Sequence, residues 1–150
     1  MSGHDDGEPI SGDLAAIVAG ASVMLGSLRE RAHIERALLA ALDQNEQVRE
    51  MIVASESALA AESALMTMMG IDQVQARAIL DMQQRKLATR EREQLGAEYD
   101  GIIAQIGEYE AIIASPELLQ EIAGTDRGAY LVKRGRRHRT KARRTLPKAS

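Results

Sequence analysis

The sequence predicts an all-α protein: an antiparallel coiled-coil hairpin with a small helical knob at its tip, a disordered N-terminus and a basic C-terminal tail. Two observations lead to this fold class. The 150 residues contain no Phe, no Trp and only three Tyr, whereas β-sheets favour aromatic and β-branched side chains. Two separate stretches also repeat the apolar spacing of a coiled coil, and long helices that pack along such a seam need no large aromatic side chains.

The predicted seams lie in residues 34–52 and 95–113, where apolar side chains recur at alternating intervals of four and three. This spacing keeps one face of a helix against a partner helix. Because residues 53–94 separate the two stretches, we expect an antiparallel hairpin with a globular tip. The seam residues are Ile34, Leu38, Ala41, Asn45, Val48 and Ile52, followed by Leu95, Tyr99, Ile102, Ile106, Tyr109 and Ile113.

Asn45 is the polar member of the first seam. A single seam asparagine can fix register and partner choice, but a solvated position near the tip is the more ordinary interpretation. The methionines between the seams also allow two interpretations, a ligand site or a core. Methionine commonly fills irregular gaps between packed helices, so we interpret these residues as core: Met51, Met66, Met68, Met69 and Met82.

Local capping signals divide the segment between the seams into helices. A helix is expected to begin after Ser55 or Ser57 and to end at Gly70. Asp72 can then cap the next helix, with Gln75 three residues later in a capping-box arrangement. The apolar face of that helix carries Val74, Ala78, Ile79, Met82 and Leu87.

The two ends of the chain differ from the middle. Residues 1–26 are expected to be disordered or weakly helical, because Gly20 and Gly26 each weaken a helix capped by Asp13 by about 1 kcal/mol. Residues 27–123 are expected to form the helical domain, in which Ser115 caps a last short helix to about Ala123. Residues 124–150 form the basic tail.

The net charge of −3 conceals a strongly basic C-terminus. Residues 1–132 hold ten Lys/Arg against twenty-two Asp/Glu, whereas residues 133–150 hold nine Lys/Arg and no acid. Dense cationic runs bind phosphate backbones non-specifically, so we favour nucleic-acid contact over a purely solubilising tail or one that folds back on the acidic helices. The candidate DNA-binding residues are Lys133, Arg134, Arg136, Arg137, Arg139, Lys141, Arg143 and Arg144, with Lys148 beyond them.

We expect a cytoplasmic protein with neither a catalytic nor a metal site of its own. The apolar stretch from Leu14 to Leu28 is too short to span a membrane and follows acids rather than a positively charged signal region. The sequence has no cysteine, and no glycine-rich phosphate loop. His4, His33 and His138 are too scattered to bind a metal ion, and we interpret His33 as a helix-packing residue.

Two motif blocks, RERAHIERALLAALD at residues 29–43 and IDQVQARAILDMQQRKLATREREQL at residues 71–95, closely resemble the A subunit of DNA gyrase and topoisomerase IV. The resemblance covers about residues 29–123. The positions that carry it are Arg31, Ala32, His33, Ile34, Leu38, Ala41 and Leu42, then Gln75 to Met82.

In that family the matching segment is the coiled-coil arm and the exit gate, whose knob meets its twin and closes a cavity for transported DNA. The resemblance implies that a helix around residues 27–53 pairs with residues 91–114. It also implies knob or dimer roles for Ile79, Met82 and Leu87. Gln84 and Arg90 stand where the family usually shows leucine, which could weaken the dimer contact, since an unsatisfied buried polar group costs about 1–3 kcal/mol.

The resemblance implies no autonomous DNA cleavage. The family's catalytic tyrosine lies in an upstream winged-helix domain, and Tyr99, Tyr109 and Tyr130 do not match it. ATP and Mg²⁺ belong to the partner B subunit, so no cofactor is expected in this chain. The expected partners are DNA, a second copy or a gyrase-A-like subunit, and a gyrase B-type subunit. The alternatives are an interaction protein that modulates or caps gyrase, and a decayed gyrase-A-like remnant.

Overall fold

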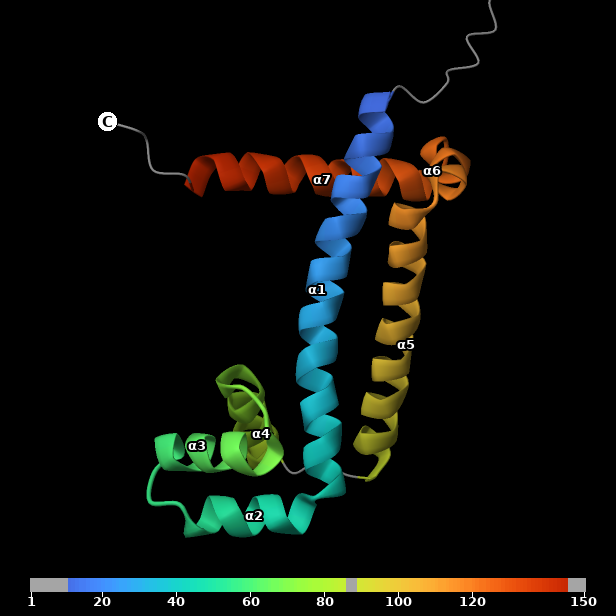
Figure 1. Ribbon diagram of the computed structural model, residues 1–150. Helices are drawn as coiled ribbons and strands as arrows, with labels where there is room; N and C mark the ends of the chain where they lie inside the picture. Colours follow the sequence, from blue (N-terminus) through green and yellow to red (C-terminus); the bar gives the residue numbers. More distant parts are fainter. Residues whose placement is uncertain (1–10, 86–88, 146–150) are drawn as a thin grey trace, which may run out of the picture. The chain divides into compact units, whose positions relative to one another are not determined.

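A computed structural model describes the backbone of residues 11–85 and 89–145 and the side chains of residues 13–83 and 92–145 (Figure 1). Every element in these ranges is helical, which confirms the all-α class. The chain forms two compact units, one of Arg29–Ala104 and one that combines the residues up to Leu28 with those from Gln105 onward. The described helices are α1 (Ser11–Asp43), α2 (Asn45–Ala54), α3 (Ala58–Met69), α4 (Gln73–Arg85), α5 (Thr89–Ala114), α6 (Pro116–Ala123) and α7 (Asp126–Thr145).

The capping signals of α3 and α4 are confirmed. Ser57 caps α3 by accepting a hydrogen bond from the Ala60 N–H at 3.1 Å, and Gly70 ends the helix in the left-handed region at φ 64°. Asp72 and Gln75 form the reciprocal capping box of α4, with bonds of 3.0 and 2.9 Å. Each bond satisfies a backbone N–H that lacks an intrahelical acceptor.

The start of α6 is confirmed as well. The Ser115 side chain accepts from the Leu118 N–H at 3.3 Å, and Pro116 occupies the first helical position. After α6, Thr125 caps α7, because its hydroxyl accepts from the Gly128 N–H at 3.2 Å. The sequence prediction contained the break after α6 but no helix beyond it.

Two expectations about the first half of the chain are wrong. The weak helix that was expected to end near Leu25 is part of α1, which continues through Gly20 and Gly26 to Asp43. The continuous helix expected over residues 27–53 is interrupted at Gln44, and α2 begins at Asn45. This interruption redirects the chain, so that Val48 of α2 is buried in one core with residues of α3 and α4.

The helices α2, α3 and α4, which we call the knob, pack with the end of α1 around one apolar core in the Arg29–Ala104 unit. The predicted methionine core is confirmed, because Met82 is buried in it and four more methionines pack against it. The buried residues of this knob core are Ala37, Ala41, Val48, Leu65, Ala76, Ile79 and Met82, and the flanking methionines are Met51, Met66, Met68 and Met69.

In the other unit, α7 crosses α1 at backbone contact (Figure 1). A Cβ at Gly20 would lie 1.8 Å from the Leu131 carbonyl oxygen, and a Cβ at Gly135 would lie 2.8 Å from that of Ala16. Glycine permits this approach because it carries no side chain. The helix-propensity cost of Gly20 is therefore offset by packing, which single-helix reasoning does not include.

We predict that Gly20→Ala lowers the urea midpoint of unfolding, because the added methyl group meets a backbone carbonyl that cannot move without displacing α7. Overpacking of this kind costs about 1–3 kcal/mol. Gly26→Ala is the matched control on the same helix, since nothing lies within 4 Å of a Cβ at Gly26. There the helix propensity of alanine should raise stability by about 1 kcal/mol. The urea midpoint is measured by circular dichroism. Equal shifts of the midpoint in the two variants would contradict the close crossing.

Candidate nucleic-acid interface and gate knob

His33 on α1 joins the N-terminus of α4 through three contacts. Its Nε2 pairs with the Asp72 carboxylate, and the Gln75 side-chain amide donates to the His33 carbonyl oxygen at 2.8 Å. The same amide nitrogen lies 3.3 Å from His33 Nδ1. A ring that carries its proton on Nε2 satisfies all these partners, with Nδ1 as the acceptor. His33 therefore links α1 to α4 through polar contacts, while its side chain stays half exposed.

Asp72 serves this junction and the helix cap at once. The backbone N–H of Gln75 and then the His33 ring bind its carboxylate, and both hold the pKa of Asp72 below its ordinary value of 3.8. Both partners favour the ionised form. The carboxylate therefore contributes to the stability of the α1–α4 contact while it is ionised.

Polar pairs connect the remaining helices of this unit. Glu62 of α3, although buried, accepts from Arg77 Nε of α4 at 3.1 Å. Arg92 of α5 pairs with Asp43 at the end of α1. The Arg92–Asp43 pair places the start of α5 beside the end of α1 within the unit. The coiled-coil geometry of the hairpin stays a prediction. A buried carboxylate such as Glu62 requires a partner of this kind.

Glu35 is a charged group inside the contact between α1 and α5. Burial raises its pKa, the nearby Glu98 of α5 raises it further, and Arg31 opposes both effects. One of its carboxylate oxygens is buried without a hydrogen-bond partner among the described residues. A carboxyl group with a raised pKa destabilises the folded state when ionised. This contact therefore weakens as the pH rises through the folded-state pKa of Glu35. The predicted seam included the neighbouring Ile34 and gave no sign of a carboxyl group in this contact.

The predicted seam residues have different surroundings in the two halves. On the first half, Ile34 is half-buried on α1, and Asn45 is exposed at the start of α2, where it accepts from the Gln83 amide at 3.2 Å. Leu38, Ala41, Val48 and Ile52 belong to or pack against the knob core. Of the predicted seam residues on α5, Ile102 and Tyr109 are buried, and Leu95, Tyr99, Ile106 and Ile113 are half-buried. Ile112, which the seam pattern did not include, is buried as well.

Two of the proposed dimer residues hold the knob itself together. Ile79 and Met82 are 0% and 6% exposed, so in this conformation they offer no surface to a second copy. Leu87 lies outside the described residues, as do the side chains of Gln84 and Arg90. The large apolar side chains exposed on the knob are instead Val53, Leu59 and Val74, at 85%, 67% and 58%. The expectation that Val74 lies with Ile79 and Met82 on the packed face of α4 is therefore wrong.

A shallow depression lies between α2, α3 and α4, and its lining includes Ile52 and Ala58, the sequence neighbours of Val53 and Leu59. Its walls are mainly small and apolar. The residues that line the depression are Ile52, Ser55, Ser57, Ala58, Ala61, Leu80 and Gln83.

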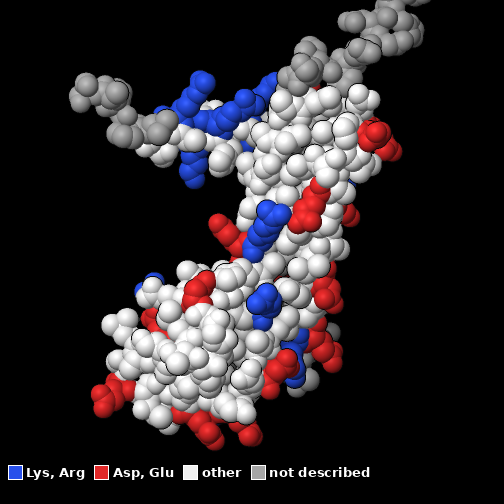
Figure 2. Space-filling model, in the orientation of Figure 1, with Lys and Arg blue, Asp and Glu red and all other residues white. Residues whose placement is uncertain are grey.

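The eight described candidate DNA-binding residues all lie on α7, and all are exposed; Lys148 lies outside the described residues. Gly128, Leu131 and Gly135 are the buried positions of this helix. Figure 2 shows Lys and Arg side chains gathered on α7. On the exposed side, a shallow depression is lined by Arg136, Arg137, Thr140, Lys141 and Arg144.

The positive charge of α7 has little compensation within its unit. Arg127, in the first turn, bonds to Glu108 at 3.0 Å and lies over the Tyr109 ring at 5.4 Å. From Lys133 to Arg144, no cation forms an ion pair with a described acid of the same unit. Neighbouring like charges on a helix destabilise it, so an anion that binds here would relieve repulsion.

Neither a metal site nor a membrane span is found within the described ranges. No group of three His, Asp or Glu side chains in residues 13–83 and 92–145 could hold a metal ion. No helix in the part of the chain that the structure describes is long and apolar enough to cross a membrane.

Comparison with known proteins identifies the family. A family model for the A subunit of DNA gyrase/topoisomerase IV matches residues 12–126. The DNA gyrase A subunit of Streptomyces coelicolor is 38% identical over 132 residues, which cover 88% of this chain and 15% of that protein. The Mycobacterium tuberculosis protein is 38% identical over 128 residues, or 85% and 15% of the two chains. In Streptococcus pneumoniae the identity is 40% over 92 residues, or 61% and 11%.

The chain therefore belongs to the family of DNA gyrase/topoisomerase IV A subunits, and the resemblance seen in the sequence is confirmed. It spans about 15% of the length of the first two relatives. The match begins at residue 12, well before the first motif block, and therefore includes the N-terminal half of α1. It ends at residue 126, where α7 begins.

We predict that Asp72→Asn destabilises the protein at neutral pH but not in acid. Asparagine also caps helices, so the variant mainly removes the charge that binds His33. The folded-state pKa of Asp72 is lowered. The stability that its carboxylate contributes is therefore fully present at a pH above the ordinary pKa of aspartate, and it is lost as the pH falls through the folded-state pKa.

The measurement is the unfolding midpoint of both proteins between neutral and acidic pH. Asp81→Asn, an exposed change on the same helix, is the matched control. A difference between Asp72→Asn and the unsubstituted protein that stays constant with pH would contradict the role of the Asp72 carboxylate.

Proposed function

We propose that this chain is a gate arm of a type II DNA topoisomerase, which pairs through its knob and contacts DNA through α7 without cleaving DNA itself. The observation that carries this proposal is the family match over residues 12–126. That range includes all of the knob, both long helices that lead to and from it, and α6. The proposed role is to hold and release DNA during strand passage.

The knob is the proposed contact with a second copy or with a gyrase-A-like partner. Val53 and Leu59 support this assignment because both are large apolar side chains exposed on the knob surface. Burial of such side chains in a twofold contact would remove them from water, at about 25 cal/mol per Å² of apolar surface. Ile79 and Met82 would support the contact indirectly, by keeping the knob rigid.

The helix α7 is the proposed DNA contact. Its uncompensated Lys and Arg side chains match the charge of a phosphate backbone, and neutralised phosphates release counterions, which favours binding at low salt. Gly20 and Gly135 hold α7 against α1, and the cations of α7 are all exposed. The contact is expected to be independent of base sequence.

Cleavage, ATP hydrolysis and Mg²⁺ binding are assigned to other domains or subunits of the assembly, including a gyrase B-type subunit. Two of the three tyrosines of this chain are largely covered by neighbouring residues. Tyr109 is buried beneath Arg127, and Tyr99 is half-buried on α5 among the predicted seam residues. The third, Tyr130, is 45% exposed, and its hydroxyl oxygen accepts from Arg134 at 3.0 Å.

The test is a graft into a complete enzyme. Residues 12–126 would replace the matching segment of the Streptomyces coelicolor gyrase A subunit, and the hybrid would be assayed with its B subunit, ATP, Mg²⁺ and relaxed plasmid. We predict ATP-dependent supercoiling, because the grafted arm can open and close the gate.

The controls separate folding from function. DNA cleavage by the hybrid reports an intact upstream domain, and the ungrafted chain alone should leave plasmid topology unchanged. A hybrid that cleaves DNA but does not supercoil it contradicts the gate-arm role. Inhibition of intact gyrase by the free chain, together with an inactive hybrid, would replace this proposal by a capping function.

A further inference from the structure

We propose that α7 binds single-stranded nucleic acid, with the ring of Tyr130 as a stacking surface for a base and the adjacent cations as phosphate ligands. This inference rests on the proposed DNA contact of α7 and specifies the form of nucleic acid that it prefers. Three features carry it: an exposed aromatic ring, an anchored hydroxyl group and a continuous row of cations.

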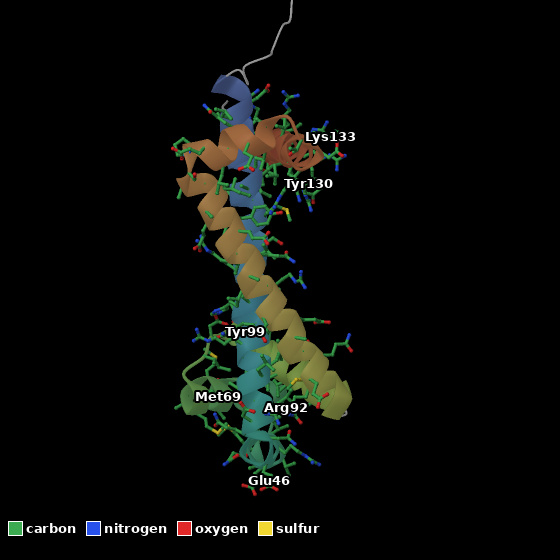
Figure 3. All side chains as sticks on the ribbon, turned by 90° about the vertical axis from the view of Figure 1, so that its right-hand side faces the viewer. Glu46, Met69, Arg92, Tyr99, Tyr130 and Lys133 are labelled. Atoms are coloured by element: carbon green, nitrogen blue, oxygen red, sulfur yellow. The ribbon has the colours of Figure 1, made fainter. Side chains whose placement is uncertain are left out.

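Tyr130 is the exposed tyrosine among the three. Its exposed fraction is 45%, compared with 8% for Tyr109, and Tyr99 is half-buried. It lies in the second turn of α7, and Figure 3 shows it on this helix together with Lys133. An aromatic ring at the surface has no packing role that would explain its size, but it presents a face on which any base can stack.

The hydroxyl end of Tyr130 is fixed by two neighbours. Arg134 Nε donates to the Tyr130 oxygen at 3.0 Å, and the hydroxyl group lies 3.9 Å from the Met24 sulfur on α1. The Arg134 guanidinium lies over the ring, 5.5 Å from its centroid, so a base would stack on the opposite face. The ring is therefore held in one orientation, which lowers the entropy cost of binding.

The ring continues into a row of cations. Tyr130, Arg134, Arg137 and Lys141 follow one another at intervals of four, three and four, which places them on one side of a helix. Arg137 and Lys141, with Arg144, also line the depression on the exposed side of α7. From Tyr130 to Arg144 the helix rises about 21 Å, enough to follow several nucleotides of an extended strand.

This combination favours a single strand over a duplex. In a duplex the base faces are stacked on each other, so the Tyr130 ring would have no base face on which to stack. Single-strand binding sites combine a cationic path with aromatic stacking surfaces. An anionic membrane is disfavoured, because residues 133–145 contain no large apolar side chain that could enter the acyl region.

The experiment compares the full chain and its variants by fluorescence anisotropy with a labelled oligothymidine and a labelled duplex of equal length. Tyr130→Leu keeps the side chain large and apolar but removes the aromatic face, and we expect it to weaken oligothymidine binding roughly tenfold or more. Duplex affinity should be unchanged. Tyr130→Phe restores the ring and should bind oligothymidine close to the affinity of the unsubstituted chain. Far-ultraviolet circular dichroism verifies that each variant keeps its helices.

Other outcomes overturn the inference in distinguishable ways. If Tyr130→Leu affects both nucleic acids equally, or neither, the stacking role is wrong while the cationic contact remains. Arg137→Gln with Lys141→Gln should weaken binding to both and reduce its salt dependence. If the unsubstituted chain binds neither nucleic acid, the DNA contact of the proposed function fails as well. Preferential binding to anionic vesicles would also overturn the single-strand assignment.

Discussion

The hydrogen bonds among His33, Asp72 and Gln75 hold α4 of the knob against α1. Through them, the carboxylate that caps α4 also holds a ring on α1, so the orientation of α4 follows from that of α1. Ile79 and Met82 enter the knob core from α4, and Arg77 of the same helix binds the buried Glu62 of α3. The junction also brings together the two blocks that mark the family, since His33 belongs to the first block and Asp72 and Gln75 to the second.

Local signals predicted much of the fold because their causes are local. The capping box at Asp72 and the glycine stop at Gly70 each depend on a few consecutive residues. Periodicity did not reveal the turn at Gln44, because Ala41 before it and Val48 after it enter the same core and so continue one apolar pattern. The helical state of α7 was missed for a similar reason: its cations concealed the spacing of Gly128, Leu131 and Gly135, which only the crossing with α1 explains.

The glycines show why tertiary contacts decide the meaning of a weak helix former. Gly20 and Gly135 let two backbones touch, whereas a Cβ at Gly96, Gly101 or Gly107 on α5 would meet nothing within 4 Å. The α5 glycines therefore lower helix stability without any packing gain in the described structure. Burial and the nearby Glu98 also raise the pKa of Glu35, so an ionised carboxylate is a further unfavourable feature of the contact between α1 and α5.

The most direct test of the central claim, that the chain is a gate arm which pairs through its knob, is its mass by sedimentation equilibrium. The account predicts a concentration-dependent dimer of the 16.3 kDa chain, which Val53→Asp and Leu59→Asp convert to a monomer. Ile103→Asp, at an exposed apolar position on α5, should leave the dimer intact. A monomer at every concentration, or a dimer that survives both knob substitutions, would contradict the claim.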